Sequence, residues 1–241
     1  MLESAKLKLD RANHHIRDLK SALDLFIQTY PDVVKIDHDA DTGKVSVNIR
    51  LREEVPTPST LSLIIGDAIH NLRTALDHAI WELIGLDGGT QDWTNLPARD
   101  TRQKYDDACL KVKTPRHDTK NFLINLAIYK DGTGKEVYGL HLLDNADKHA
   151  VLTPVVGVCS TSTVEFMNNG QSIGSMHNAT SASFSVPPGT KLDPKSDFTV
   201  DIFFGDVAFV PKQPVIPTLV HLADVVADTL RQFEEFVRTR N

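Results

Sequence analysis

The segment from Leu61 to Ile84 constrains the fold more than any other part of the chain, because its pattern is that of one long amphipathic helix. Apolar side chains recur at intervals of three or four residues and form a single face: Ile65, Ile69, Leu72, Leu76, Ala79 and Leu83. A face of this length must be buried against other elements. We expect Ser59 or Thr60 to be the N-cap.

Two more segments of this kind lie near the ends of the chain. The first has an apolar stripe from Leu9 to Phe26, and the second spans residues 216–239. Shorter helices are expected at 102–111, 121–129 and 137–151. Alternation of apolar and polar residues predicts a β-hairpin within 33–51 and an antiparallel β-rich section within 151–210. We therefore predict one α+β domain over 1–241, because separate halves would leave the last helix without a partner.

Composition limits the classes of function. The chain has 241 residues and a formal net charge of -6, which argues against a duplex-DNA binder. Cys109 and Cys159 are its only cysteines and form no CxxC pair, so a thiolate zinc site is not expected. The sequence begins without an apolar signal core and has no bilayer-long apolar run, which predicts a cytoplasmic protein with no membrane partner. Neither GxGxxG nor GxxxxGK[ST] occurs, and no cofactor is expected.

The face of the 61–84 helix opposite the apolar stripe is rich in groups that can do chemistry. It carries Asp67, His70, Asn71, Thr74, Asp77, His78 and Trp81. Arg73 lies at the border, four residues before Asp77, so the two can pair. A second dense stretch, GLHLLDNADKHAVL at 139–152, places His141, Asp144, Asp147 and Lys148 on one side of a helix, with His149 on another side. If these helices pack together, Asp67, His70, His78, Asp144 and Asp147 meet in one pocket.

The two stretches also carry a family resemblance. The run GDAIHNLRTALDH, followed some sixty residues later by LLDNADKH, resembles a widespread family of uncharacterised bacterial proteins with GDxxHNLRxALDH and LDxxDKHR motifs. The resemblance covers most of the chain and implies a β-rich C-terminal part. This chain has Ala150 where the family has an arginine after DKH.

Within the first motif, Arg73 and His78 have the Arg-x4-His spacing of HEPN nucleases, which are small helical RNA-cleaving domains. The resemblance implies a helical bundle layer, RNA cleavage without a metal ion, a homodimer that shares its site, and a toxin–antitoxin or defence setting. HEPN domains favour Asn, Asp or His at the position of Thr74. On this resemblance we predict catalytic roles for Arg73, His78 and His70, and orienting or binding roles for Asp67, Asn71, Asp77, Asp144, Asp147, Lys148 and His149.

Two alternatives use the same residues differently. In the first, the polar face is a buried hydrogen-bonded layer of a non-enzymatic binding or assembly protein. In the second, His70, His78, Asp67 and Asp144 hold a metal ion in a hydrolase. The RNA hypothesis also requires a locally basic site, because the chain as a whole is acidic. Arg73, Lys148 and Arg116 are the candidate cations for such a site.

Overall fold

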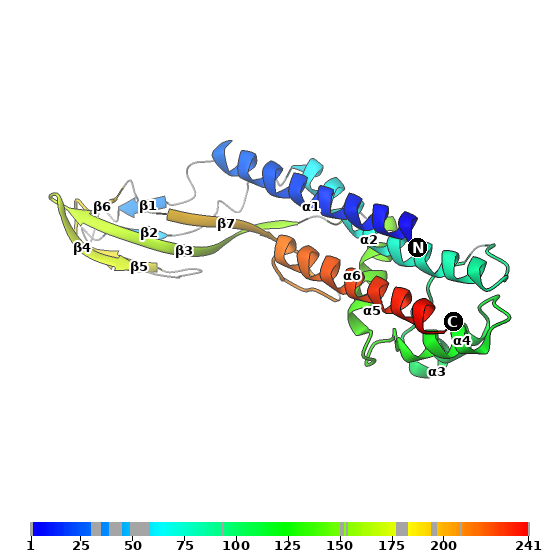
Figure 1. Ribbon diagram of the computed structural model, residues 1–241. Helices are drawn as coiled ribbons and strands as arrows, with labels where there is room; N and C mark the ends of the chain where they lie inside the picture. Colours follow the sequence, from blue (N-terminus) through cyan, green and yellow to red (C-terminus); the bar gives the residue numbers. More distant parts are fainter. Residues whose placement is uncertain are drawn as a thin grey trace.

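A computed structural model of the chain describes residues 2–29, 35–38, 45–48, 58–92, 94–149, 152, 154–176, 183–193, 197–207 and 209–240. Three long helices lie side by side: α1 (Glu3–Thr29), α2 (Ser59–Leu86) and α6 (Val215–Thr239) (Figure 1). Three shorter helices, α3 (Arg102–Leu110), α4 (His117–Asn125) and α5 (Lys135–His149), lie beside them. Antiparallel strands form the other part of the molecule, so the predicted α+β class is confirmed.

The long helices are held together by the apolar faces that the sequence predicts. The stripe of α2 is completely buried, and those of α1 and α6 pack against it in one core. Burying each large aliphatic side chain stabilises the fold by about 1.5–3 kcal/mol. At the start of α1, the Leu2 amide and the Ser4 hydroxyl donate hydrogen bonds to the Glu82 carboxylate near the end of α2. This contact makes α1 antiparallel to α2.

Helix boundaries differ from the predicted ones where local chemistry decides them. The N-cap of α2 is Pro58 and makes no side-chain cap hydrogen bond, so the prediction of Ser59 or Thr60 as the cap is wrong. Proline presets a φ close to the helical value, and the helix begins directly after it. By contrast, Thr101 caps α3 by accepting a hydrogen bond from the Lys104 amide. Helix α4 begins at His117, four residues earlier than predicted.

The strands form two sheets that extend away from the helices (Figure 1). In the first, β1 (Lys35–His38) and β2 (Val45–Asn48) pair antiparallel as the predicted hairpin, and β5 (Ser183–Val186) extends it along β2. The residues that connect the hairpin strands, 39–44, lie outside the described residues. In the second sheet, the long β3 (Val155–Asn168) pairs with β4 (Gln171–Met176), β6 (Lys191–Leu192) and β7 (Asp197–Phe203).

The second sheet is joined to the helices through the end of β7. Phe203 makes a β-bridge with Pro214, directly before α6, and the Phe204 amide donates to the Gln213 carbonyl. The side chains of Ile202 and Phe204 are buried in the same core as the helices. None of the described helices is both long enough and apolar enough to cross a membrane.

Candidate functional site

The helices α2 and α5 come close together at Gly66, the glycine of the GDAIHNLR motif. A Cβ atom added to Gly66 would lie 2.5 Å from the Asp147 Oδ2 atom. Any side chain at this position would displace the carboxyl group. Burial raises the pKa of Asp147, although the Leu152 amide donates a hydrogen bond to it. The glycine therefore allows the polar faces of the two motif helices to meet.

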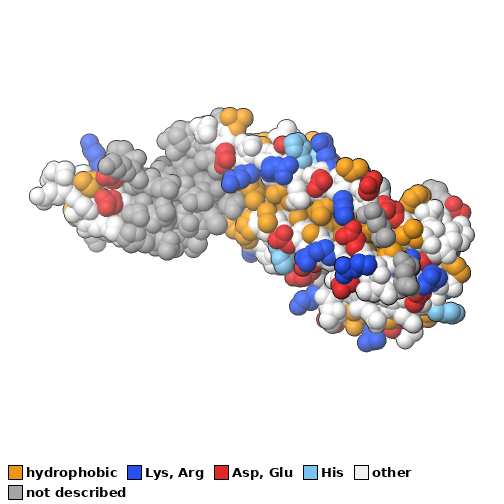
Figure 2. Space-filling model, in the orientation of Figure 1, with side chains coloured by type: hydrophobic (Ala, Val, Ile, Leu, Met, Phe, Trp, Pro, Cys, Tyr) orange, Lys and Arg blue, Asp and Glu red, His pale blue; other side chains and the backbone are white. Residues whose placement is uncertain are grey.

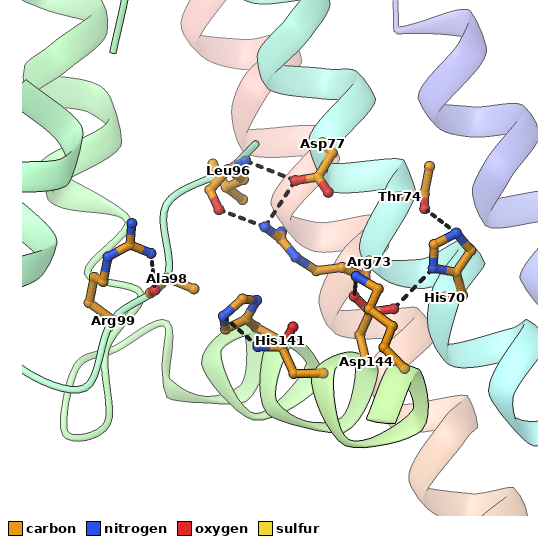
Figure 3. A network of polar contacts seen from close by, with 11 residues as sticks. His70, Arg73, Thr74, Asp77, Leu96, Ala98, Arg99, His141 and Asp144 are labelled. Atoms are coloured by element: carbon orange, nitrogen blue, oxygen red, sulfur yellow. Dashed lines mark hydrogen bonds and ion pairs between the residues drawn. The ribbon is translucent and has the colours of Figure 1, made fainter. Parts of the chain in front are cut away.

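Asp144 is the point at which the two faces meet (Figure 3). Its side chain is 2% exposed and accepts hydrogen bonds from His70 Nδ1 at 3.0 Å and from Lys148 Nζ at 2.5 Å. Because a carboxylate can only accept hydrogen bonds, the Nδ1 atom of His70 must carry a proton in this contact. The Thr74 hydroxyl lies 3.4 Å from the other ring nitrogen. The structure thus brings together three of the predicted site residues from both motifs.

Arg73 forms a second network with the segment that follows α2 (Figure 3). Its Nη2 atom lies 2.9 Å from Asp77 Oδ1 and donates to the Leu96 carbonyl at 2.6 Å. Asp77 Oδ1 also accepts from the Leu96 amide at 2.8 Å. The predicted pairing of Arg73 with Asp77 is confirmed. Arg73 is only 4% exposed, and its Nη1 atom is buried with no hydrogen-bond partner.

Burial shapes the ionisation of this pair. It raises the pKa of the Asp77 carboxyl, while the Arg73 charge acts in the opposite direction. It also lowers the pKa of the Arg73 guanidinium, against the attraction of Asp77. The attraction between Arg73 and Asp77 therefore favours the charged form of each residue, while their burial away from water opposes it.

Both networks border one pocket of about 630 Å³ between α2, the 94–99 segment, α3 and α5. Its lining includes six cationic side chains and four aspartates: Arg73, Arg99, Lys104, Lys111, Lys113 and Lys148, with Asp77, Asp92, Asp107 and Asp144. The chain as a whole carries a net charge of -6. The pocket lining is therefore a locally basic surface on an acidic protein.

His141 and Arg99 line this pocket and were not among the predicted site residues. Helical spacing places His141 on the same side of α5 as Asp144 and Lys148, but no catalytic or binding role is predicted for it. Burial, followed by the nearby Arg73 charge, lowers the pKa of His141 to about 4, so the ring is neutral at neutral pH. Arg99 belongs to a segment without helix or strand, where no periodic pattern marks its position.

The remaining predicted residues do not line the pocket. His78 follows Arg73 by five residues, which turns it about 140° around α2, and it is absent from the lining. Asn71 donates to the Asp67 carbonyl within α2. His149 is exposed at the end of α5. Arg116 pairs with the exposed Asp118 and is also outside the pocket.

The metal-hydrolase alternative requires several ligands at one point. Across the described ranges, no three His, Cys, Asp or Glu side chains form a group that could hold a metal ion. His70 and Asp144 meet, but the proposed further ligand His78 makes no ion pair or hydrogen bond with them among the described residues.

The site therefore consists of a basic pocket with one buried arginine, one neutral histidine and a shared aspartate. No known protein family matches this chain, and neither a curated protein nor a solved structure is significantly similar to it.

Proposed function

We propose that this protein is a HEPN-like RNA-binding and RNA-cleaving protein that binds an RNA phosphate in the pocket between α2 and α5. The observation that carries the proposal is the basic lining of this pocket, which includes Arg73 of the Arg-x4-His motif. A homodimer and a toxin or defence setting are part of the proposal through the HEPN resemblance alone, and the location proposed for the protein is cytoplasmic.

Local charge supports an RNA ligand. On the face that Figure 2 shows, Lys and Arg side chains alternate with Asp and Glu over the helices, so no broad basic surface is present there. The pocket differs, because its lining has six cationic side chains and four carboxylates. Arg73, Lys148 and Lys104 pair with Asp77, Asp144 and Asp100. The excess of positive charge therefore comes from Arg99, Lys111 and Lys113. The positive charge of the pocket lining would attract a phosphate group, whereas the net charge of the acidic chain would repel it.

The proposed reaction is transfer of the phosphoryl group to the neighbouring ribose oxygen. The 2′-oxygen attacks phosphorus and forms a new P–O bond, and the bond to the 5′-oxygen breaks. One base accepts the 2′-hydroxyl proton and one acid protonates the leaving 5′-oxygen. The Arg73 charge would stabilise the negative charge that develops on the phosphoryl oxygens. His78 does not line the pocket in one chain, so its proposed part requires a second copy to supply it.

The test is cleavage of a single-stranded oligoribonucleotide by the purified protein in EDTA, compared with Arg73→Lys and His78→Ala. Arg73→Lys keeps a positive charge and limits the risk of unfolding, which circular dichroism checks. We expect cleavage by the wild-type protein and a loss of about 10²-fold or more in each variant.

Three results would contradict the proposal. They are absence of cleavage by the folded wild-type protein, cleavage that both variants retain, and cleavage that EDTA abolishes. The last would favour the metal-dependent alternative. Equilibrium sedimentation of the same sample tests the homodimer, and a monomer that cleaves RNA would remove the shared site from the proposal.

A second candidate is the non-enzymatic binding or assembly protein. One observation favours it: Arg73 Nη2 and Asp77 Oδ1 bind each other and the Leu96 backbone within the fold, as in a structural polar layer. Under this candidate Arg73→Lys lowers the melting temperature and the protein never cleaves RNA. Cleavage by the wild-type protein would reject it.

A further inference from the structure

Three side chains from three separate segments form a row along the pocket (Figure 3). Arg73 comes from α2, His141 from α5 and Arg99 from the segment before α3, and all three line the same cavity. His141 lies between the two arginines in this view. We call these residues the Arg73–His141–Arg99 row.

Arg99 has no ion pair among the described residues, and Arg73 has one, with Asp77. The Arg99 guanidinium donates from Nη1 to the Ala98 carbonyl at 2.7 Å. The Arg99 side chain is exposed and lines the pocket. Arg73 lies deeper, and its ion pair with Asp77 uses only Nη2, so Nη1 stays buried without an acceptor. A buried donor without a partner destabilises the fold unless something supplies negative charge nearby.

His141 adds a neutral donor between these charges. The amide Nδ2 of Asn145 lies 3.0 Å from His141 Nε2, and an amide NH2 group can only donate. Nε2 is therefore the acceptor, and the ring proton is on Nδ1. Among the described residues, no acceptor binds this N–H group. It is therefore available to an acceptor on a ligand.

We propose that the Arg73–His141–Arg99 row is a binding subsite for one phosphate group. Arg99 and His141 Nδ1 donate hydrogen bonds to its oxygens, and the buried Arg73 adds positive charge. A tetrahedral anion has several acceptor oxygens and can therefore bind donors from the three segments that line this pocket. The subsite rests on the proposed function, since it assigns the phosphate that the pocket takes from RNA, but inorganic phosphate carries the same chemistry and can be tested alone.

The experiment is isothermal titration of the full-length protein with inorganic phosphate, at low ionic strength and pH 7.5. The variants are Arg99→Ala and His141→Gln, with Arg116→Ala and His221→Gln as matched controls. Arg116 pairs with Asp118, and the exposed His221 pairs with Glu136, both outside the pocket. We expect saturable binding, weakened about tenfold or more by each row variant, because each loses a hydrogen bond to the charged phosphate oxygens. Both controls should bind as the wild-type protein does.

The His141 ring provides a second readout that a merely structural role would not change. The charged groups that face it are Arg73 from α2, Arg99 from the preceding segment, and Asp144 and Lys148 from α5. A bound anion stabilises the imidazolium form, so saturation with sulfate should raise the His141 pKa, as followed by NMR titration of the ring. Sulfate is chosen because it remains a dianion over the whole titration.

Absence of saturable binding, equal binding by wild-type protein and row variants, or an unchanged His141 pKa in saturating sulfate would each overturn the subsite. Failure of the proposed function gives a different result. Phosphate that binds the row in a protein that never cleaves RNA leaves the subsite intact and rejects the nuclease. RNA cleavage that Arg99→Ala and His141→Gln leave unchanged would reject the subsite and leave the nuclease proposal intact.

Discussion

At the scale of single residues, Arg73 shows how burial changes what a motif residue does. Its spacing from Asp77 predicts an ion pair on the surface of a helix, where such a pair is worth little. In the folded chain the side chain is almost completely buried, and Asp77 also accepts from the Leu96 amide. The pair therefore attaches the 94–98 segment to α2 and shapes one wall of the pocket.

Replacement of Asp77 by alanine should destabilise the protein strongly. The change leaves the Arg73 guanidinium buried without its carboxylate, and the Leu96 amide loses its acceptor. We expect the free energy of unfolding to fall by about 2–4 kcal/mol, as measured by urea denaturation. Asp100→Ala removes an exposed partner of Lys104 and should change the free energy of unfolding far less. Equal effects of the two changes would show that the buried Arg73–Asp77 pair stabilises the fold no more than an exposed pair does.

His141 should make stability depend on pH. Its pKa in the folded protein is lowered from 6.5 to about 4, so between these values the unfolded chain binds a proton that the folded chain does not. The free energy of unfolding should therefore fall as the pH drops from about 6.5 to about 4. His141→Gln removes this contribution, and the wild-type loss should exceed that of the variant by about 1–3 kcal/mol in urea denaturation at each pH. If the free energy of unfolding falls with pH by the same amount in the wild-type protein and in His141→Gln, His141 is not the source of the pH dependence.

At the scale of elements, the end of α6 is attached to the end of α2 by a buried ion pair. The Asp87 side chain is completely buried, and it accepts from Arg240 Nη1 at 2.7 Å and from the Thr114 hydroxyl at 2.6 Å. The same Arg240 atom donates to the Thr119 hydroxyl of α4, and the guanidinium lies over the Phe236 ring. One side chain thus joins three helices.

Arg240→Ala should therefore be far more harmful than a similar change two residues earlier. The substitution leaves the Asp87 carboxylate buried without its cation, and we expect a loss of about 3–5 kcal/mol in the free energy of unfolding. Arg238 is highly exposed and lies 4.0 Å from Glu235, so Arg238→Ala should cost less than about 0.5 kcal/mol. Thermal and urea unfolding measure both. A loss under about 1 kcal/mol in Arg240→Ala would show that the pair does not hold α6 in place.

At the scale of the whole molecule, net charge and local charge have opposite signs. The chain carries -6, whereas the pocket lining is basic. Under the proposed function, affinity for RNA depends on the pocket rather than on the total charge. Two substitutions that alter the total charge equally can separate these contributions.

Arg99→Glu and Arg116→Glu each replace a cation by an anion, one inside the pocket and one outside it. We expect Arg99→Glu to raise the dissociation constant for a single-stranded oligoribonucleotide about tenfold or more, and Arg116→Glu to raise it less than about threefold. Fluorescence anisotropy at two salt concentrations measures both. Equal losses would show that RNA responds only to the net charge of the chain.

The long helices could be predicted from the amino-acid pattern alone, because a repeating apolar face is a local property that does not depend on what covers it. The stripes of α1, α2 and α6 and the hairpin of β1 with β2 were all readable in this way. The pairing of Arg73 with Asp77 was readable for the same reason, since both residues belong to one helix.

Contacts between side chains of different elements could not be predicted in this way, because they depend on how the elements pack. The contact of His70 with Asp144 depends on the close approach of α2 and α5 at Gly66, and the pairing of β2 with β5 joins strands more than a hundred residues apart. Arg99 has no periodic neighbours, so its place in the pocket follows from the Leu96 contacts with α2. Long-range contacts depend on packing that no local pattern encodes. Spacing could therefore predict the polar faces of the motif helices, and the fold determined the pocket between them.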